Sequence, residues 1–381
     1  MKKLAFFSLI VGIILFFGCS SKKYHTEKKK DHLLIKNNIK DNLDIKQFHL
    51  LDEKSFPSEK RLHLYLHAAN EDMLGTIINK NSDRYLILVD KKLNIVEEKK
   101  LKKGRGPGEV GNWLPGMGMS NEQLYILDNR KNSIEIFNMN LEYEDTCQIN
   151  SSDFRMNFGF TDINSVDDSF VLAPVISLSE DIIGAKINKK GKLLGYIEGE
   201  KPSGQIEHFS IKNLARYTKG PDKKLYMVMI GYKNKYLIRK YDKNLNLLWE
   251  NEINDGLQQI LSPEIVRFKD GSFELQGGRA CSNIDVDEEN IYVLRGVGGI
   301  NKFEWKDNRK VRHHKDIKPI NCGFVDVFDK KSGKFKYRIK GEFLNTKQDY
   351  SLYVIDNKFY FISPYSNKYK YSNKIITADV E

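Results

Sequence analysis

The residues 103–110 read Lys-Gly-Arg-Gly-Pro-Gly-Glu-Val, a run whose types and spacing are suited to binding an anion. Three glycines and a proline build a compact loop around Arg105 and Glu109, and the backbone of such a loop can approach a phosphate closely. The alternative is a structural corner that ties both side chains to nearby backbone or charge. The sequence favours the corner, because the Gly-Lys-Ser/Thr ending of a P-loop is absent and no helix pattern follows.

A second candidate segment is the insertion at residues 295–321, which is long for a chain of otherwise tight turns. Aromatic rings beside arginine and histidine suit an acidic sugar, a peptide carboxylate or a partner protein. An equally simple interpretation is a solvated flap pinned by Trp305. The residues that we predict to contribute to ligand binding on these two segments and the turn between them are Arg105, Glu109, Arg130, Trp305, Arg312, His313 and His314.

Common catalytic and metal-binding motifs are absent from the sequence, namely Gly-X-Ser-X-Gly, His-Glu-X-X-His and Cys-X-X-Cys. His63 and His67 are four residues apart, but the leucines around them alternate as in a strand, where such residues lie roughly 13 Å apart and cannot share a metal. The acidic run 285–289 suggests calcium, yet it falls at a turn position that recurs along the chain. We therefore predict no metal site and no cofactor.

The N-terminus predicts export and lipid attachment. A basic start and an apolar run at Leu4–Phe17 are typical of a secretion signal and too short for a spanning helix. Gly18 before Cys19 resembles the lipobox of bacterial lipoproteins, so Cys19 is predicted to carry the lipid; an ordinary signal peptide with an incidental cysteine is the alternative. Residues 1–18 are then a signal peptide, residues 19–40 a lipidated flexible tether and residues 41–381 the folded domain.

The formal net charge of +11 is concentrated before the domain, because the tether holds seven lysines against Glu27 and Asp31. The basic composition is therefore no argument for nucleic-acid binding. Lysines next to a lipid anchor suit contact with anionic headgroups. We expect the protein to be anchored through Cys19 to membrane lipid, facing the periplasm from the outer membrane, with an unknown protein, peptide or glycan as partner.

The remaining cysteines allow one disulfide. Cys281 and Cys322 flank the same predicted blade and are able to pair in an oxidising compartment. Cys147 is predicted to be a plain buried residue of an outer strand.

The elements that position these residues are predicted to be strands. Residues 124–149 alternate with a period of two around turns rich in Asp and Asn, so they predict three antiparallel strands. An apolar strand followed by Asp or Asn and a polar turn recurs at intervals of 48 to 54 residues, apart from one longer step, at Asp90, Asn138, Asn188, Asp242, Asp329 and Asp379. Units of this length are typical of four-stranded propeller blades.

We therefore predict an all-β fold, a six-bladed β-propeller of four-stranded antiparallel blades. The last unit ends at Glu381 without a fourth strand, and the free strand-like segment Ile45–Leu51 is expected to supply it and close the ring. Strand parity then places the loop 104–111 and the insertion 295–321 on one face of the ring, because both connect strands at the same end of a blade.

The lipobox, the segment 124–138 (LYILDNRKNSIEIFN) and above all Gly-X-Gly-Pro-Gly-Glu at 104–109 resemble the TolB-like six-bladed propeller lipoproteins of Bacteroides-type bacteria. The resemblance covers residues 45–381 and implies a fold and an anchored location, without any catalytic residue. The function that we expect is a ligand-binding or assembly module on the face bearing both loops. The alternative is a metal-dependent hydrolase or lyase, with calcium as the divalent ion in the channel.

Overall fold

The computed structural model describes most of a single compact unit, residues 33–381. The described ranges are 33–39, 43–58, 66–150, 152, 154, 160–174, 182–198, 215–232, 235–254, 264–267, 273–276, 283–295, 301–306, 309–314, 323–345, 350–367 and 370–380. This part of the chain is all-β, as predicted, and contains no α-helix; a 3₁₀ turn, η3 (Glu342–Asn345), follows Gly341. Within the same ranges, no helix has the length and apolar character needed to cross a bilayer.

Three sheets of four antiparallel strands follow one another in the first half of the chain. The first sheet contains β3 (His67–Ala69), β4 (Met73–Lys80), β5 (Asp83–Asp90) and β6 (Ile95–Leu101). The second contains β7 (Gly116–Met119), β8 (Gln123–Asp128), β9 (Ser133–Asn138) and β10 (Tyr143–Gln148). The third contains β11 (Phe160–Val166), β12 (Ser169–Pro174), β13 (Ile182–Asn188) and β14 (Leu193–Glu198). The predicted strands within 124–149 are thus confirmed as β8, β9 and β10.

Two larger sheets follow. The five-stranded sheet contains β15 (Ala215–Lys219), β16 (Leu225–Tyr232), β17 (Lys235–Tyr241) and β18 (Leu247–Asn254), with β1 (Leu33–Asn38) outside β18. The eight-stranded sheet has the order β21-β22-β25-β26-β2-β29-β28-β27. Its strands are β21 (Asn283–Val286), β22 (Asn290–Arg295), β25 (Phe324–Asp329), β26 (Phe335–Lys340), β2 (Ile45–Ser58), β29 (Lys370–Val380), β28 (Lys358–Asn367) and β27 (Ser351–Ile355).

Two hairpins form separate two-stranded sheets, β19 (Glu264–Arg267) with β20 (Phe273–Gln276) and β23 (Asn301–Lys306) with β24 (Arg309–His314). The second hairpin lies within the insertion 295–321. That segment therefore contains regular structure, where the sequence predicts a long loop.

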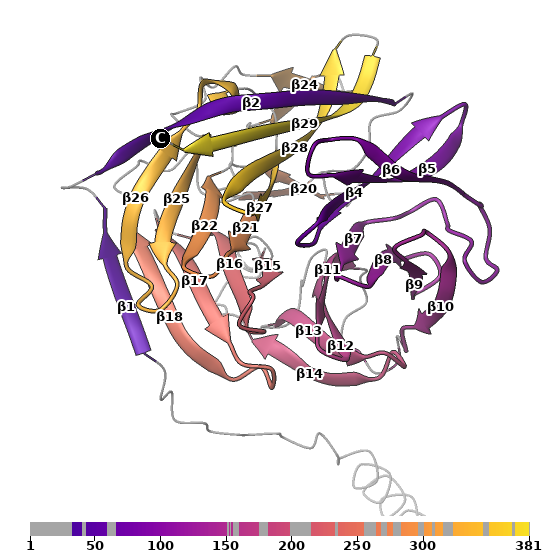
Figure 1. Cartoon of the computed structure of the whole chain (residues 1–381), viewed down its shortest axis with the longest axis horizontal. Coiled ribbons are helices and arrows are strands. Elements are labelled where there is room, and N and C mark those ends of the chain that lie inside the picture. Colours follow the sequence, from indigo (N-terminus) through magenta and orange to yellow (C-terminus); the bar gives the residue numbers. More distant parts are fainter. Residues whose placement is uncertain are drawn as a thin grey trace, which may run out of the picture. The chain divides into compact units, whose positions relative to one another are not determined.

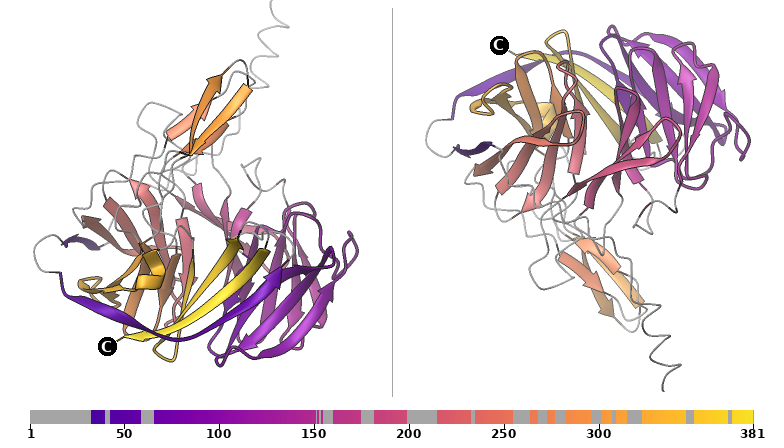
Figure 2. Two further views of the ribbon diagram at one scale, coloured as in Figure 1. Left: turned by 90° about the horizontal axis from the view of Figure 1, so that it is seen from above. Right: turned by 90° about the horizontal axis from the view of Figure 1, so that it is seen from below.

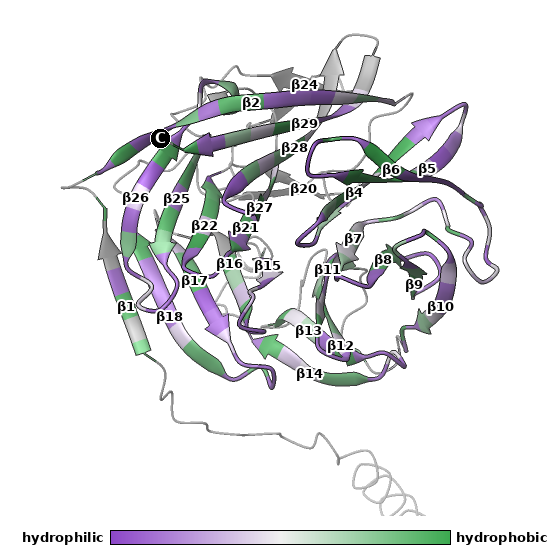
Figure 3. Cartoon of the chain, in the orientation of Figure 1, coloured by the Kyte–Doolittle hydropathy of each residue, from purple (hydrophilic) through white to green (hydrophobic). Residues whose placement is uncertain are grey.

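The four- to eight-stranded sheets stand side by side around a common centre, with β7, β11, β15, β21 and β27 nearest to it (Figure 1). Apolar side chains from facing sheets fill the space between neighbours; Tyr125 and Leu127 of β8, for example, pack with Phe170 and Leu172 of β12. Figure 3 shows the same division, with apolar residues along β22 and β25 and a largely hydrophilic outer strand β10. The core is thus divided into layers between adjacent sheets.

The recurring Asp or Asn shapes the turn between the third and fourth strands of a sheet. At Asn138, the side-chain oxygen accepts hydrogen bonds from the N–H groups of Asn140 (3.0 Å) and Glu142 (2.9 Å), and Leu141 between them has a φ of 58°. Equivalent pairs of bonds are made by Asp90, Asn188 and Asp242. A short side chain that can bond its own backbone two and four residues on explains why this position is Asp or Asn.

The N-terminal strand β2 pairs with the C-terminal strand β29, as the sequence predicts for residues 45–51. The pairing is antiparallel from Phe48 opposite Val380 to Ser58 opposite Tyr371. At its beginning, β2 also pairs in parallel with β26. Figure 2 shows β2, in indigo, running alongside the yellow β29.

The first and last sheets also pack against each other. Asn373 of β29 donates to the Thr76 hydroxyl (2.8 Å) and to the Ile77 carbonyl (3.0 Å) of β4, and the Tyr353 hydroxyl of β27 donates to the His67 carbonyl (2.8 Å). The first and last sheets therefore meet through side-chain hydrogen bonds, in addition to the pairing of β2 with β29.

The predicted tether is wrong in its last residues. Instead of a flexible segment through residue 40, Leu33–Asn38 form β1, which pairs in parallel with β18 from Leu33 opposite Trp249 to Asn38 opposite Asn254. Ile39 is buried, and its N–H donates to the Asn254 carbonyl (3.0 Å). The outer edge of β18 supplies backbone partners that this short segment does not reveal by itself.

Candidate functional site

The glycine-rich segment forms a tight loop between β6 and β7. The Gly104 N–H donates to the Val110 carbonyl (3.2 Å) and the Val110 N–H to the Lys102 carbonyl (2.8 Å), so the two ends of the loop run side by side. Gly108 has a φ of 68°, and a Cβ there would lie 2.8 Å from the Tyr143 ring. The loop therefore requires glycine for both its conformation and its packing.

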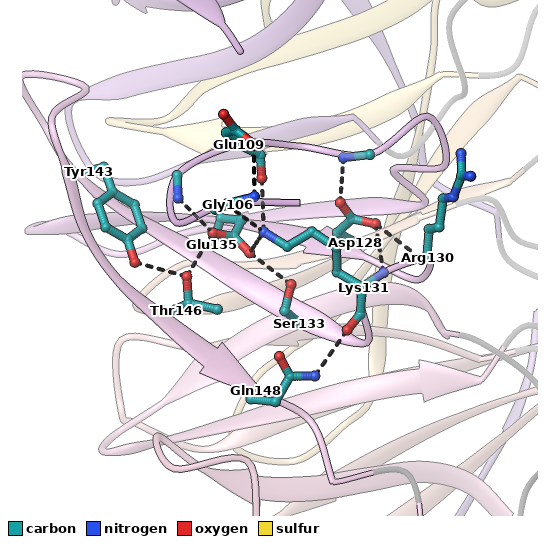
Figure 4. A network of polar contacts seen from close by, with 12 residues as sticks. Gly106, Glu109, Asp128, Arg130, Lys131, Ser133, Glu135, Tyr143, Thr146 and Gln148 are labelled. Carbon is teal, nitrogen blue, oxygen red and sulfur yellow. Dashed lines mark hydrogen bonds and ion pairs between the residues drawn. The ribbon is translucent and has the colours of Figure 1, made fainter. Parts of the chain in front are cut away.

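A buried ion pair next to this loop holds it in place (Figure 4). The Lys131 Nζ lies 2.6 Å from Glu135 Oε1, and the two side chains are 9% and 0% exposed. The same ammonium group donates to the carbonyls of Gly106 and Glu109, each at 3.0 Å. Lys131 thereby binds loop backbone and carboxylate together, as a buried charge requires.

Glu135 is also fully supplied with donors. Its carboxylate accepts from the hydroxyls of Ser133 (2.7 Å) and Thr146 (2.8 Å) and from the Gly108 N–H (3.1 Å), all drawn in Figure 4. These bonds join β9, β10 and the loop into one network. The backbone of the loop is therefore rigidly positioned on the second sheet.

Three glycine N–H groups that would otherwise face an anion donate to carboxylates of the protein itself. The pairs are Gly106 with Glu109 (2.8 Å), Gly108 with Glu135 (3.1 Å) and Gly111 with Asp128 (2.5 Å). A phosphate would have to displace all three carboxylates. The geometry supports the structural corner and not the phosphate cradle, and it places Glu109 inside that corner.

The two arginines of this region differ from Glu109 in their exposure. Arg105 and Arg130 are exposed, and Arg130 extends away from the network in Figure 4. Their contribution to ligand binding stays a prediction.

Sequence reasoning overlooked an exposed tryptophan at the end of the same loop. Trp113 is 47% exposed, although the backbone just before it is fixed. The guanidinium of Arg84, at the start of β5, donates to the carbonyls of Gly111 (2.5 Å) and Asn112 (2.6 Å). In the sequence, Trp113 stands three residues after Val110, the last residue of the glycine-rich motif. An interpretation that looks for charged side chains does not select it.

These contacts agree with the strand parity predicted for the loop. The loop contacts Arg84, beside the turn between β4 and β5, and Lys131, in the turn between β8 and β9. Both are turns between the second and third strands of a sheet. The insertion 295–321 is likewise the connection between the second and third strands, β22 and β25.

Within the insertion, the register of the hairpin places Trp305 opposite Lys310 and Phe303 opposite Arg312. His313 and His314 lie opposite Lys302 and Asn301. The side-chain contacts of these residues lie outside what the structure describes, as do His63 and the cysteines Cys19, Cys281 and Cys322, so their predicted roles are untested. Cys147 is buried in the outer strand β10 and is a free thiol, as predicted.

The innermost strands carry two acidic residues that sequence reasoning did not single out. Asp285 of β21 accepts from the Thr218 hydroxyl of β15 (3.2 Å) and from the Val354 N–H of β27 (2.6 Å). Asp162 of β11 accepts from the N–H of Ile163 (2.9 Å), and Arg216 and the backbone of Tyr217, both of β15, favour its charged form. Both carboxyls therefore lie between neighbouring inner strands, and Asp285 satisfies a backbone donor at a sheet edge.

Both carboxyls have altered acidity. Burial raises the pKa of Asp162 to about 6, against the opposite effect of Arg216. Burial likewise raises the pKa of Asp285 to about 7, although the N–H groups of Val354 and Val286 favour its charged form. Ionisable groups with shifted pKa values occur at active sites and also in structural networks. Here the observed hydrogen bonds are structural.

A divalent-ion site in the channel would need three or four carboxylates or amides at one point. The described residues contain no cluster of three or more His, Cys, Asp or Glu able to hold a metal. Asp162 and Asp285 already interact with neighbouring inner strands.

Two further predictions from the sequence can be compared with the structure. His67 lies in β3 and is buried; its Nδ1 is 2.9 Å from the Thr76 hydroxyl, and burial lowers its pKa to about 3. It is a neutral core residue, as its strand position predicts. In the acidic run 285–289, Asp287 accepts from the N–H groups of Glu289 (2.8 Å) and Asn290 (2.6 Å), so the predicted turn role is confirmed.

No protein-family model matches the chain, and no curated protein matches its sequence. Among solved structures, a candidate exported protein of Bacteroides fragilis is 11% identical over 91% of this chain and 99% of its own, with a TM-score of 0.51. A member of the DUF4221 family from Bacteroides vulgatus is 12% identical over 88% and 98%, with a TM-score of 0.48. The first likeness shows a shared propeller-like fold. The chain is thus an all-β protein of the propeller-like class.

Proposed function

We propose that the chain is a lipid-anchored cell-envelope protein whose six-bladed β-propeller binds a ligand or partner protein. Division of the eight-stranded sheet between β26 and β2 yields two groups of four strands, which brings the number of blades to six. In this arrangement β2 is the outer strand of the last blade. The pairing of β2 with β29 and the contacts between the first and last sheets support ring closure by the N-terminal strand.

Export and anchoring are supported by the signal-like N-terminus and by Cys19, at the position that resembles a lipobox. The similar protein of Bacteroides fragilis is described as a candidate exported protein, which agrees with this location. The TolB-like lipoproteins that the sequence resembles are our proposed family. Because β1 begins at Leu33, the tether of the proposal spans residues 19–32, and it ends at the outer edge of β18.

The observation that carries the binding function is the rigid loop 104–111. Its conformation is fixed by a buried ion pair and by three carboxylates, while Arg105 and the adjoining Arg130 remain exposed. Binding to a preformed surface avoids the entropic cost of ordering it. Strand parity adds the insertion 295–321 to the same face. We therefore place partner binding on this face.

Co-purification tests the proposal. The full-length protein is isolated from detergent-solubilised membranes, and the proteins and glycans that accompany it are identified by mass spectrometry. We expect a partner with the wild type that is lost with the double variant Arg105→Ala/Arg130→Ala at an unchanged melting temperature. The matched control is Lys189→Ala/Lys190→Ala, which removes two exposed cations from the β13–β14 turn. The same set of molecules from all three proteins would contradict the proposal.

A further inference from the structure

We propose that the loop face binds an acidic polysaccharide, with Trp113 as the stacking surface and the surrounding cations as partners of its carboxylates. This inference rests on the proposed function, because it assigns a ligand class to the same face. The inference goes beyond the proposed function by naming Trp113 as the residue that determines specificity.

Trp113 has the properties of a binding aromatic. The residue is 47% exposed, and contact of a large apolar ring with water is unfavourable in the free protein. Nearly half of its surface is therefore available to a ligand. The Arg84 guanidinium fixes the carbonyls of Gly111 and Asn112, and the Gly111 N–H is held by Asp128. The ring is therefore presented on a segment whose backbone is already ordered, which reduces the entropic cost of binding.

The exposed charges of the loop and of the adjoining turn are mainly basic. The acids of the network, Glu109, Asp128 and Glu135, accept hydrogen bonds from the loop backbone. The exposed cations of the same loop and the adjoining turn are Lys102, Lys103, Arg105 and Arg130. These acids are thus engaged by the loop itself while its cations are exposed, and the partly exposed Asp83 and Glu98 of the first sheet are paired with Lys100 and Lys80, so the loop surface is complementary to an anionic partner.

The distribution of these cations favours an extended ligand. They are exposed and spread from the start of the loop to the neighbouring turn, so a polymer with regularly spaced charges can engage several of them together. The C–H face of a pyranose ring stacks on an indole, and the planar fork of arginine matches a carboxylate. A polymer of uronic acids supplies both groups in every residue.

The test uses the full-length protein in detergent micelles and polygalacturonate as the probe. Binding is followed by calorimetry and by quenching of tryptophan fluorescence. We expect binding that weakens with rising salt and that falls roughly thirtyfold or more in Trp113→Ala. Arg105→Ala/Arg130→Ala should also weaken binding and should reduce its salt dependence. Leu194→Ala, at another exposed apolar residue, and Lys190→Ala are controls that should bind as the wild type does.

Melting temperatures separate loss of binding from loss of fold, because surface changes typically alter stability by under about 0.5 kcal/mol. Equal binding of neutral dextran, equal or tighter binding of single-stranded poly(dT), or unchanged affinity of Trp113→Ala would overturn the inference. If polygalacturonate does not bind while a partner still co-purifies in an Arg105- and Arg130-dependent way, the ligand class is wrong and the proposed function stands. If neither is observed, both fail.

Discussion

Lys131 and Glu135 show how two side chains determine the conformation of an otherwise irregular segment. The glycine-rich loop makes few backbone hydrogen bonds of its own, and the buried pair supplies partners for the Gly106 and Glu109 carbonyls and for the Gly108 N–H. The pair is therefore part of the fold. Its importance for function is indirect, since it positions the exposed residues of the loop.

Removal of one partner of this pair should be strongly destabilising. Glu135→Gln leaves the Lys131 ammonium buried without its counter-charge, and we expect a loss of about 3 kcal/mol in the free energy of unfolding, measured by urea denaturation. Glu98→Gln is the matched control, because the Lys80–Glu98 pair has side chains 40% and 32% exposed and should contribute less than about 1 kcal/mol. Equal losses in the two variants would contradict the role assigned to the buried pair.

Asp285 should make stability depend on pH in a defined direction. Its native carboxyl keeps a proton up to a pKa of about 7, whereas the unfolded chain releases it near 3.8. Between these values the unfolded state binds fewer protons, so this group lowers stability as pH rises. As the pH rises from about 4 to about 7, we expect the free energy of unfolding of Asp285→Asn to increase relative to that of the wild type by up to a few kcal/mol.

The difference between the two proteins, measured by urea denaturation at several pH values, isolates this group from His67. The histidine acts in the opposite direction: burial lowers its pKa to about 3, so stability falls as pH drops below about 6.5. A constant difference across the range would show that Asp285 titrates normally in the native state.

At the scale of elements, the turns were predictable and the long-range pairings were only partly so. An Asp or Asn that bonds its own backbone leaves a local signature, which is why the spacing of Asp90, Asn138 and Asn188 revealed the strand ends. The β2–β29 pairing could also be predicted, because the last unit lacked a strand. β1 could not, because the sheet that it joins already has four strands, β15 to β18, so the repeat pattern does not call for a further strand.

The candidate site, too, could be predicted from the sequence only in part. Glycines and a proline made the loop visible in the sequence, and strand parity gave its face. Trp113 follows loop backbone that is bound by Arg84 of another sheet, and the contacts of Asp162 and Asp285 with neighbouring inner strands form only where the sheets meet in the folded protein. Neither leaves a local pattern.

The position of β1 leads to a truncation experiment. A chain that begins at residue 33 should melt at the same temperature as one that begins at residue 20, because residues 20–32 are polar and lysine-rich and offer almost no apolar side chain to bury. A chain that begins at residue 40 loses the β1 pairing and the buried Ile39, which is 4% exposed, and we expect a loss of about 1.5–3 kcal/mol. Identical melting of all three chains would mean that β1 does not stabilise the domain.

At the scale of the whole molecule, we propose a ring of sheets that is attached to a membrane through the N-terminal tether. Cys19→Ala should move the protein from the membrane fraction to the soluble periplasmic fraction, because one residue carries the proposed anchor. Fractionation and metabolic labelling with a fatty-acid analogue measure this directly. Wild-type protein that takes up no label would remove the lipid anchor from the account.

The central claim is that partners bind on the face of the loop 104–111. In-cell photo-crosslinking tests it most directly, with a photoreactive residue introduced either at Arg105 or at Lys190. Both positions are exposed, and strand parity places the β13–β14 turn of Lys190 on the opposite face. We expect discrete crosslinked products from position 105 and none from position 190. Products from position 190 alone, or equally from both, would contradict it.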